Sequence, residues 1–166
     1  MELYLFVFYS FIYILPAYIC NSSAALFGGG LQLDGGRTWR GKPLLGAGKT
    51  WRGTLAGVFF GTVTAALIGI FFGQPFFYLM LGILLSAGAI TGDLLKSVIK
   101  RQIGIAQGKP FIIVDQIDFL VFAMLFGLPL FVPSVETAVF LLLITPAIHL
   151  FVNAMGYLTK QKAVPY

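Results

Sequence analysis

Long apolar runs separated by short polar breaks dominate the chain. The runs cover residues 3–19, 55–72, 75–90, a stretch that ends at 132, and 135 to about 155. A helix needs about 20 residues to cross the hydrocarbon core of a bilayer, and each run supplies most of that length. The breaks near Gly73 and Pro133 contain Gly and Pro, which are typical of tight turns. The pattern therefore predicts an all-α bundle of five transmembrane helices.

Composition agrees with a polytopic membrane protein. Of the 166 residues, 58% are hydrophobic and only 10% are charged, and the mean hydropathy is +0.92. Soluble domains are about 25% charged, so a water-soluble globule is excluded. Because Cys20 is the single cysteine, an intrachain disulfide is excluded too. The length predicts one transmembrane domain, 1–166, with long cytoplasmic loops at about 20–54 and 92–114.

The basic residues predict the orientation of this bundle. All eleven lie in two loops and the tail: Arg37, Arg40, Lys42, Lys49 and Arg52; Lys96, Lys100, Arg101 and Lys109; Lys160 and Lys162. With five spans, these three segments share one face of the membrane. The positive-inside rule makes that face cytoplasmic, so we expect a multi-pass cell-membrane protein with its N-terminus outside and its C-terminus in the cytoplasm.

Two carboxylates lie deeper than a loop would place them. The purely apolar part of the fourth span, 119–132, is too short to cross a bilayer, so the helix must start near Ile113. Asp115 and Asp118 then fall in its first two turns and on one face. Helix N-capping explains one aspartate but not the second. Two such carboxylates repel each other unless a cation lies between them, which favours a metal site.

A third carboxylate lies on a polar stripe at the end of the third span. Asp93, Lys96, Ser97 and Lys100 follow one another at helical spacing. Oxygen ligands of this kind select Mg²⁺, which completes its shell with waters and phosphate oxygens, while lysines hold the remaining phosphate charge. The alternative for Lys96 and Lys109 is an anchor to anionic lipid headgroups. The constellation favours phosphoryl or nucleotidyl transfer, which depends mainly on positioning and charge stabilisation.

Glycine and cations are concentrated in the first long loop. Residues 28–53 contain nine glycines and five cations, and such segments can surround phosphates with backbone N–H groups. A flexible basic linker is the alternative. The Gly48-Lys49-Thr50 triplet is not a Walker A motif, because Pro43 stands where that motif needs Gly. With one Cys and one His in the chain, no zinc cluster is predicted.

Glycines also recur within the second span. Gly53, Gly57 and Gly61 are spaced four residues apart, which lets helices approach closely in lipid. We expect them to pack against another helix of the same chain; a second copy of the chain is the alternative, and the oligomeric state stays open.

The order of the polar residues resembles the signature of the CTP-dependent phosphatidate cytidylyltransferases. The residues that match are Gly92-Asp93-Leu94, Ser97, Lys100-Arg101 and Asp115-x-x-Asp118. The size, the five spans and the loop Gly46-Ala-Gly-Lys-Thr-Trp-Arg-Gly53 are most similar to the archaeal branch, the CDP-archaeol synthases. The resemblance extends from Asn21 through Asp118.

This resemblance implies a reaction and a set of roles. CTP and a lipid phosphate, in archaea digeranylgeranylglyceryl phosphate, would give a CDP-lipid and pyrophosphate. Asp93, Asp115 and Asp118 would be catalytic and bind Mg²⁺, and Lys100 would act beside them. The remaining candidates for CTP and phosphate binding are Asn21, Lys42, Lys49, Thr50, Arg52, Ser97 and Arg101. The expected partners are CTP, the lipid phosphate and membrane lipids, without nucleic acid, around a polar cavity open to the cytoplasm.

Three alternatives remain from the sequence. A polyprenol or diacylglycerol kinase would use the same metal and cations but transfer the γ-phosphoryl group. A transporter would need polar residues on both faces, whereas nearly all of them here lie on one. A structural role gives no reason to embed Asp118 in a span.

Overall fold

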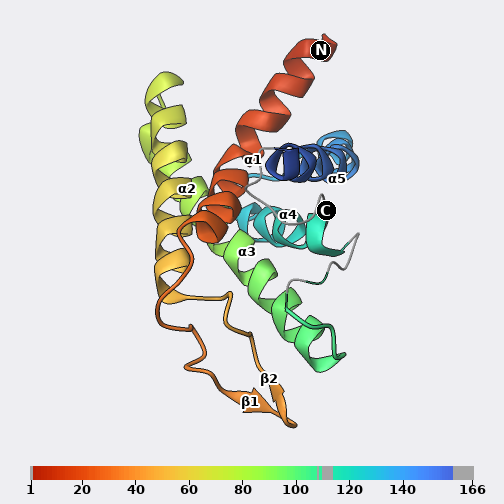
Figure 1. Ribbon diagram of the computed structural model, residues 1–166. Coiled ribbons are helices and arrows are strands. Elements are labelled where there is room, and N and C mark those ends of the chain that lie inside the picture. Colours follow the sequence, from red (N-terminus) through yellow and green to blue (C-terminus); the bar gives the residue numbers. More distant parts are fainter. Residues whose placement is uncertain (1, 108, 110–113, 159–166) are drawn as a thin grey trace.

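Five helices make up most of the protein (Figure 1). The computed structural model describes residues 2–107, 109 and 114–158. The helices are α1 (Leu3–Leu26), α2 (Trp51–Phe71), α3 (Pro75–Gln102), α4 (Val114–Gly127) and α5 (Val135–Leu158). The prediction of an all-α five-helix bundle is confirmed. Ile113, and the tail cations Lys160 and Lys162, lie outside the described residues.

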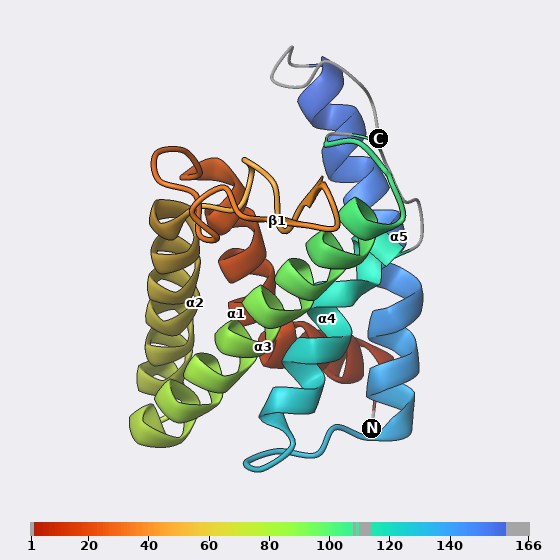
Figure 2. The same cartoon turned by 90° about the horizontal axis from the view of Figure 1, so that it is seen from below.

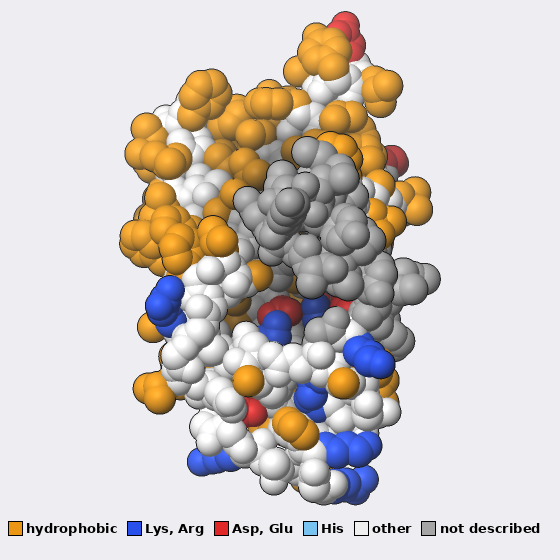
Figure 3. Space-filling model, in the orientation of Figure 1, with side chains coloured by type: hydrophobic (Ala, Val, Ile, Leu, Met, Phe, Trp, Pro, Cys, Tyr) orange, Lys and Arg blue, Asp and Glu red, His pale blue; other side chains and the backbone are white. Residues whose placement is uncertain are grey.

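Three of the described helices are long and apolar enough to cross a membrane, namely α1, α2 and α3. The other two contain shorter apolar stretches, Ile117–Gly127 and Val135–Ile148. Large apolar side chains of α2, among them Phe59, Leu67 and Phe71, are exposed on the outside of the bundle. Figure 3 shows apolar side chains gathered over the helices and cations gathered at the end that carries the strands. A bilayer covers such an apolar surface, as expected for a multi-pass membrane protein.

The glycine stripe of α2 packs against α1. A Cβ added to Gly53, Gly57 or Gly61 would lie 2.6–2.8 Å from backbone oxygens of α1, those of Ala24, Cys20 and Pro16. Only glycine can be accommodated at such short distances. The four-residue spacing places one glycine at each turn of α2 that touches α1. The stripe therefore serves packing within the chain, as predicted.

The approach of α3 to α4 is equally close and sets the position of Asp118. A Cβ on Gly92 would lie 2.6 Å from the backbone oxygen of Asp118 and 3.0 Å from the Cβ of Phe122. One turn earlier, a Cβ on Gly88 would lie 2.8 Å from the Cα of Ala123. The two glycines form a flat face on α3 against which the backbone of α4 rests. Asp118 is thereby held next to the turn of α3 that follows Gly92.

The apolar core lies where α1, α3 and α4 meet. Ile14, Leu85, Phe119 and Leu120 are fully buried there. The phenol of Tyr18 on α1 and the hydroxyl of Thr145 on α5 are 2.6 Å apart and join the last helix to this core. The polar residues discussed below lie at one end of the core rather than inside it.

The long first loop is more ordered than the irregular segment that the sequence predicts. It contains a two-stranded antiparallel hairpin, β1 (Thr38–Trp39) and β2 (Lys42–Pro43). Arg40 and Gly41 turn the chain with φ values of 52° and 75°, as in the tight turns that join short hairpins. The Lys42 Nζ donates to the Gln102 carbonyl at 2.5 Å, so the hairpin lies against the end of α3 (Figures 1 and 2).

Replacing Gly92 by Ala is expected to destabilise the protein. The new methyl group would meet backbone of α4, which cannot move aside, and overpacking of this kind costs about 1–3 kcal/mol. Gly48→Ala is the matched control, because its methyl group meets only the flexible Gln107 side chain at 3.2 Å. Thermal unfolding in detergent measures both variants. A Gly92→Ala protein as stable as Gly48→Ala would contradict the close α3–α4 contact.

Candidate active site

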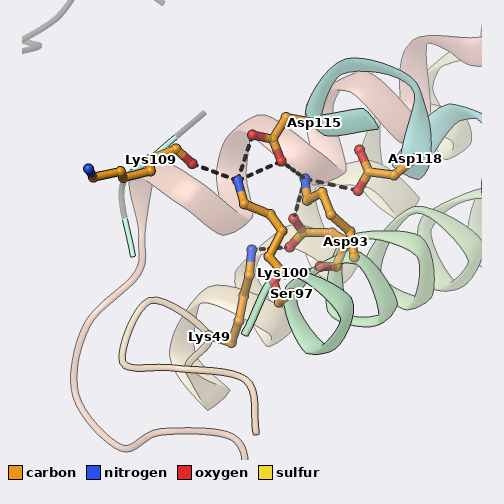
Figure 4. Close-up of polar contacts among 8 residues, drawn as sticks. Lys49, Asp93, Ser97, Lys100, Lys109, Asp115 and Asp118 are labelled. Carbon is orange, nitrogen blue, oxygen red and sulfur yellow. Dashed lines mark hydrogen bonds and ion pairs between the residues drawn. The ribbon is translucent and has the colours of Figure 1, made fainter. Parts of the chain in front are cut away.

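Helices α3 and α4 bring three carboxylates together at one end of the bundle. Asp93 comes from the last third of α3, and Asp115 and Asp118 come from the first turns of α4. Figure 4 shows these three side chains pointing toward one another, with lysine ammonium groups between them. The continuous α3 and the early start of α4 confirm the helix positions predicted for these residues.

The Lys96 ammonium lies at the centre of the three carboxylates. Its Nζ is 3.2 Å from Asp93 Oδ1, 3.7 Å from Asp115 Oδ1 and 2.9 Å from Asp118 Oδ2. The Lys96 side chain is only 13% exposed. A headgroup anchor would point outward, so the structure does not support that reading of Lys96. The cation that two neighbouring carboxylates require is here supplied by the protein itself.

Two further lysines each pair with one carboxylate at the edge of the cluster. The Lys49 Nζ, from the loop before α2, donates to Asp93 Oδ2 at 2.5 Å. The Lys100 Nζ, one turn beyond Lys96, lies 2.9 and 2.6 Å from the two oxygens of Asp115 and donates to the Lys109 carbonyl at 2.8 Å. The first loop, α3 and α4 therefore converge on one set of charges.

Asp118 is the deepest carboxylate, with a side chain that is 5% exposed. Its two oxygens are buried, and Oδ2 forms the ion pair with Lys96 at 2.9 Å. Buried oxygens of this kind are suited to a hard cation, and carboxylates are the ligands that Mg²⁺ takes from proteins. Within the described residues, however, no three such side chains converge on one ion in this arrangement. Carboxylate oxygens are suitable ligands for a divalent cation, but in this structure the Lys96 ammonium lies between the three carboxylates.

Two cavities flank the loop segment that carries Lys49. The larger, of about 540 Å³, lies between the hairpin and the end of α3, and is lined by Asp34, Arg37, Lys42, Gly46, Ala47 and Arg101. The smaller, of about 250 Å³, lies between α1, α2 and α3, and is lined by Asn21, Gly48, Lys49, Thr50, Asp93 and Leu94. The hollow in the face drawn in Figure 3 contains acidic and basic side chains. Six candidate residues thus line one of the two cavities, and five line neither: Arg52, Ser97, Lys100, Asp115 and Asp118.

Several candidate residues have structural contacts in this arrangement. The Thr50 hydroxyl accepts from the backbone N–H groups of Gly53 and Gly29, both at 3.2 Å, and so caps α2. The Ser97 hydroxyl donates to the Asp93 carbonyl at 2.8 Å. The Arg101 guanidinium donates to the Ile105 carbonyl while it lines the larger cavity. Arg52 is exposed in the first turn of α2.

Asp34 organises the basic loop, a role that the sequence did not suggest. Its carboxylate accepts from the backbone N–H groups of Gly36 at 2.9 Å and Leu45 at 2.8 Å. Desolvation raises the pKa of Asp34, but these N–H donors outweigh it and hold the pKa below its usual value. An aspartate two residues before Gly in a glycine-rich loop is the signal for such a turn.

The fold and this site define a class of protein: a helical membrane protein with a buried cluster of carboxylates and lysines at the end of its spans. Comparison with known proteins identifies the family. The family model described as CarS-like, CDP-archaeol synthase, matches residues 3–166. The chain therefore belongs to the CarS-like, CDP-archaeol synthase family.

Relatives and a solved structure agree with this assignment. The chain is 45% identical to the CDP-archaeol synthase of Methanococcus aeolicus, with 95% of each chain covered. It is also 45% identical to that of Thermococcus kodakarensis, with 96% of each covered. A solved structure of an intramembrane enzyme for archaeal membrane lipids biosynthesis superposes with a TM-score of 0.81 at 31% identity, over 86% of this chain and 91% of that one.

The Asp115–Lys100 pair is expected to contribute strongly to stability. Asp115→Asn leaves the buried Lys100 ammonium without its carboxylate, which costs about 3 kcal/mol. In a Lys100→Met background the same replacement should cost much less, because the close Lys100 cation is gone and the contact of Asp115 with Lys96, at 3.7 Å, is longer. Thermal unfolding of the wild type, both single variants and the double variant measures the difference. Equal costs in both backgrounds would show that the two groups do not interact.

Proposed function

We propose that this chain is a CTP-dependent lipid-phosphate cytidylyltransferase that transfers CMP from CTP to an archaeal glycerol-ether lipid phosphate. The products are CDP-archaeol and pyrophosphate. Membership of the CDP-archaeol synthase family supports this reaction, and so does the similarity to an intramembrane enzyme for archaeal membrane lipids. The observation that carries the site assignment is that Asp93, Asp115 and Asp118 all lie within 3.7 Å of the Lys96 ammonium.

The three carboxylates are proposed to bind Mg²⁺. The burial of both Asp118 oxygens next to a cationic group supports this role. When bound, the ion would neutralise phosphate charge and orient the α-phosphate of the nucleotide. Asp93 and Asp115 complete the donor set from the two facing helices.

The lysines are proposed to hold phosphate groups once substrates are bound. Lys49 and Lys100 each pair with one carboxylate of the cluster, and from there each ammonium group could also hold a phosphate oxygen. In the reaction an oxygen of the lipid phosphate attacks the α-phosphorus of CTP. The bond from that phosphorus to the bridging oxygen of the β-phosphate breaks, and pyrophosphate leaves with the bonding electrons. Cations fixed beside the leaving oxygens stabilise the charge that develops there.

The two cavities suit two substrates. The larger is of the size that takes small-molecule ligands, and in its lining Arg37, Lys42 and Arg101 outnumber the one acid, Asp34. We assign the nucleotide to it, with the α-phosphate reaching toward Asp93, which lines the smaller cavity. The smaller is lined by both apolar and polar residues, with Ile90 and Leu94 beside Asn21 and Lys49. We assign the lipid phosphate to it, because the lipid tails stay in the hydrocarbon region while the phosphate reaches Lys49. The loop segment 46–50 borders both cavities, so the reacting phosphates of the two substrates would meet beside it.

The orientation of the bundle is proposed to follow its basic residues. The hairpin, the end of α3 and the carboxylate cluster would face the cytoplasm, where CTP is available. Asp93 and Lys100 would then lie at the headgroup level of the inner leaflet.

Labelled CTP distinguishes this activity from a lipid kinase. With a lipid phosphate acceptor, label in the α-phosphate of CTP is expected in the lipid product, and label in the γ-phosphate is expected in pyrophosphate. Asp93→Asn, Asp115→Asn and Asp118→Asn should each lower the rate at least about 100-fold. Glu136→Gln is the matched control, because Glu136 is an exposed acid at the start of α5, outside this site. Transfer of γ-label to lipid would overturn the proposal.

Cysteine accessibility tests the orientation. Thr38→Cys in the hairpin and Ser134→Cys between α4 and α5 are exposed positions separated by three helices. In right-side-out vesicles, a membrane-impermeant maleimide is expected to label Ser134→Cys and to spare Thr38→Cys until the membrane is opened. The native Cys20 is fully buried and gives little background. The reverse pattern of labelling would contradict the proposed orientation.

A further inference from the structure

Lys96 differs from the other lysines of the carboxylate cluster by its position. Among the described residues, Lys49 forms an ion pair with Asp93, and the Lys100 ammonium bonds Asp115 and a backbone carbonyl. The Lys96 ammonium, in contrast, is within 3.7 Å of an oxygen of each of the three carboxylates. It therefore lies between the three carboxylates, in contact with Asp93 and Asp118 and slightly farther from Asp115.

The cluster is electrically balanced as it stands. Asp93, Asp115 and Asp118 face the ammonium groups of Lys49, Lys96 and Lys100, so the formal charges cancel. A balanced site attracts a free divalent cation only weakly, because each carboxylate is already neutralised at close range. A cation that enters between the carboxylates must also displace the Lys96 ammonium, since like charges at one position repel strongly.

We propose that Lys96 is a built-in counter-ion that holds the place of the divalent cation until the nucleotide binds. When the metal enters with the nucleotide, the Lys96 ammonium leaves the carboxylates and pairs with a nucleotide phosphate, whose negative charge restores the balance. The four-carbon stem of lysine allows this shift of the ammonium without movement of α3. Lys96 is thus a positioning residue: it keeps the carboxylates together without metal and makes metal binding depend on the nucleotide.

This inference rests on the proposed metal role of the carboxylates. It also predicts an effect that is not expected for a lysine that only forms a structural ion pair. Removal of Lys96 should tighten metal binding, whereas removal of a metal ligand weakens it. Lys96→Met keeps an unbranched side chain of similar length and removes the charge. Lys100→Met is the matched control, because it removes the same charge from the same cluster without vacating its centre.

The test is a titration of the full chain in detergent with Mn²⁺, at fixed pH and without nucleotide, read by electron paramagnetic resonance. We expect Lys96→Met to bind Mn²⁺ at least about tenfold more tightly than the wild type, and Lys100→Met to gain clearly less. With CTP present, the difference between Lys96→Met and the wild type should shrink. Equal gains in the two variants, or no gain in Lys96→Met, would overturn the inference.

The Asp118→Asn variant distinguishes the role of Lys96 from the metal-binding role of the carboxylates. If Asp118→Asn loses Mn²⁺ while Lys96→Met matches the wild type, the carboxylates bind metal but Lys96 does not hold its place. If none of these proteins binds Mn²⁺ at the cluster, with or without CTP, the metal role itself fails together with the inference.

A measurement on the wild type makes the test independent of how the variants fold. Acetic anhydride acylates exposed lysine amines, and peptide mass spectrometry reports the extent at Lys96. Because the Lys96 ammonium is buried among carboxylates, acylation without ligands should be slow. Mn²⁺ with pyrophosphate, which carries phosphate but hides less of the site than CTP, is expected to accelerate it several-fold. Acylation at an unchanged or lower rate would contradict the displacement of Lys96.

Discussion

Neutralisation of buried charge is the constraint on which the rest of this structure depends. Three carboxylates stand together at the ends of two apolar helices, and Asp118 is almost completely buried. Charges in such a place are tolerated only when paired. The lysines that pair with them come from the first loop and from two successive turns of α3. The same pairing therefore fixes the loop, α3 and α4 relative to one another.

Close packing of backbone allows this arrangement of charges. Gly88 and Gly92 let α4 rest on α3, so that Asp118 faces the helix turn that carries Asp93 and Lys96. The glycines of α2 do the same against α1 and bring the start of α2, with Thr50 and the preceding Lys49, to the carboxylates. Residues without side chains thus position the residues that carry the chemistry.

Much of the fold could be predicted because it depends on local pattern and on the bilayer. Apolar runs predicted the five helices, and the short apolar part of the fourth run predicted that Asp115 and Asp118 lie inside α4. Helical spacing predicted the polar stripe of α3, but not where each of its members points. Lys96 could be read as a headgroup anchor because its partners Asp115 and Asp118 come from another helix. The hairpin was missed for a similar reason, since Asp34 and Lys42 order the loop through contacts that only the folded chain provides.

The central claim is that the three carboxylates form the metal and nucleotide centre of a cytidylyltransferase. Electron–nuclear double resonance on the protein with Mn²⁺ and CTP tests it most directly, because coupling of the electron spin to ³¹P shows that metal and phosphate are bound together. We predict a ³¹P-coupled, protein-bound Mn²⁺ in the wild type that is lost when Asp93, Asp115 and Asp118 are all replaced by Asn. The same coupled signal in that triple variant, measured on folded protein, would contradict the account.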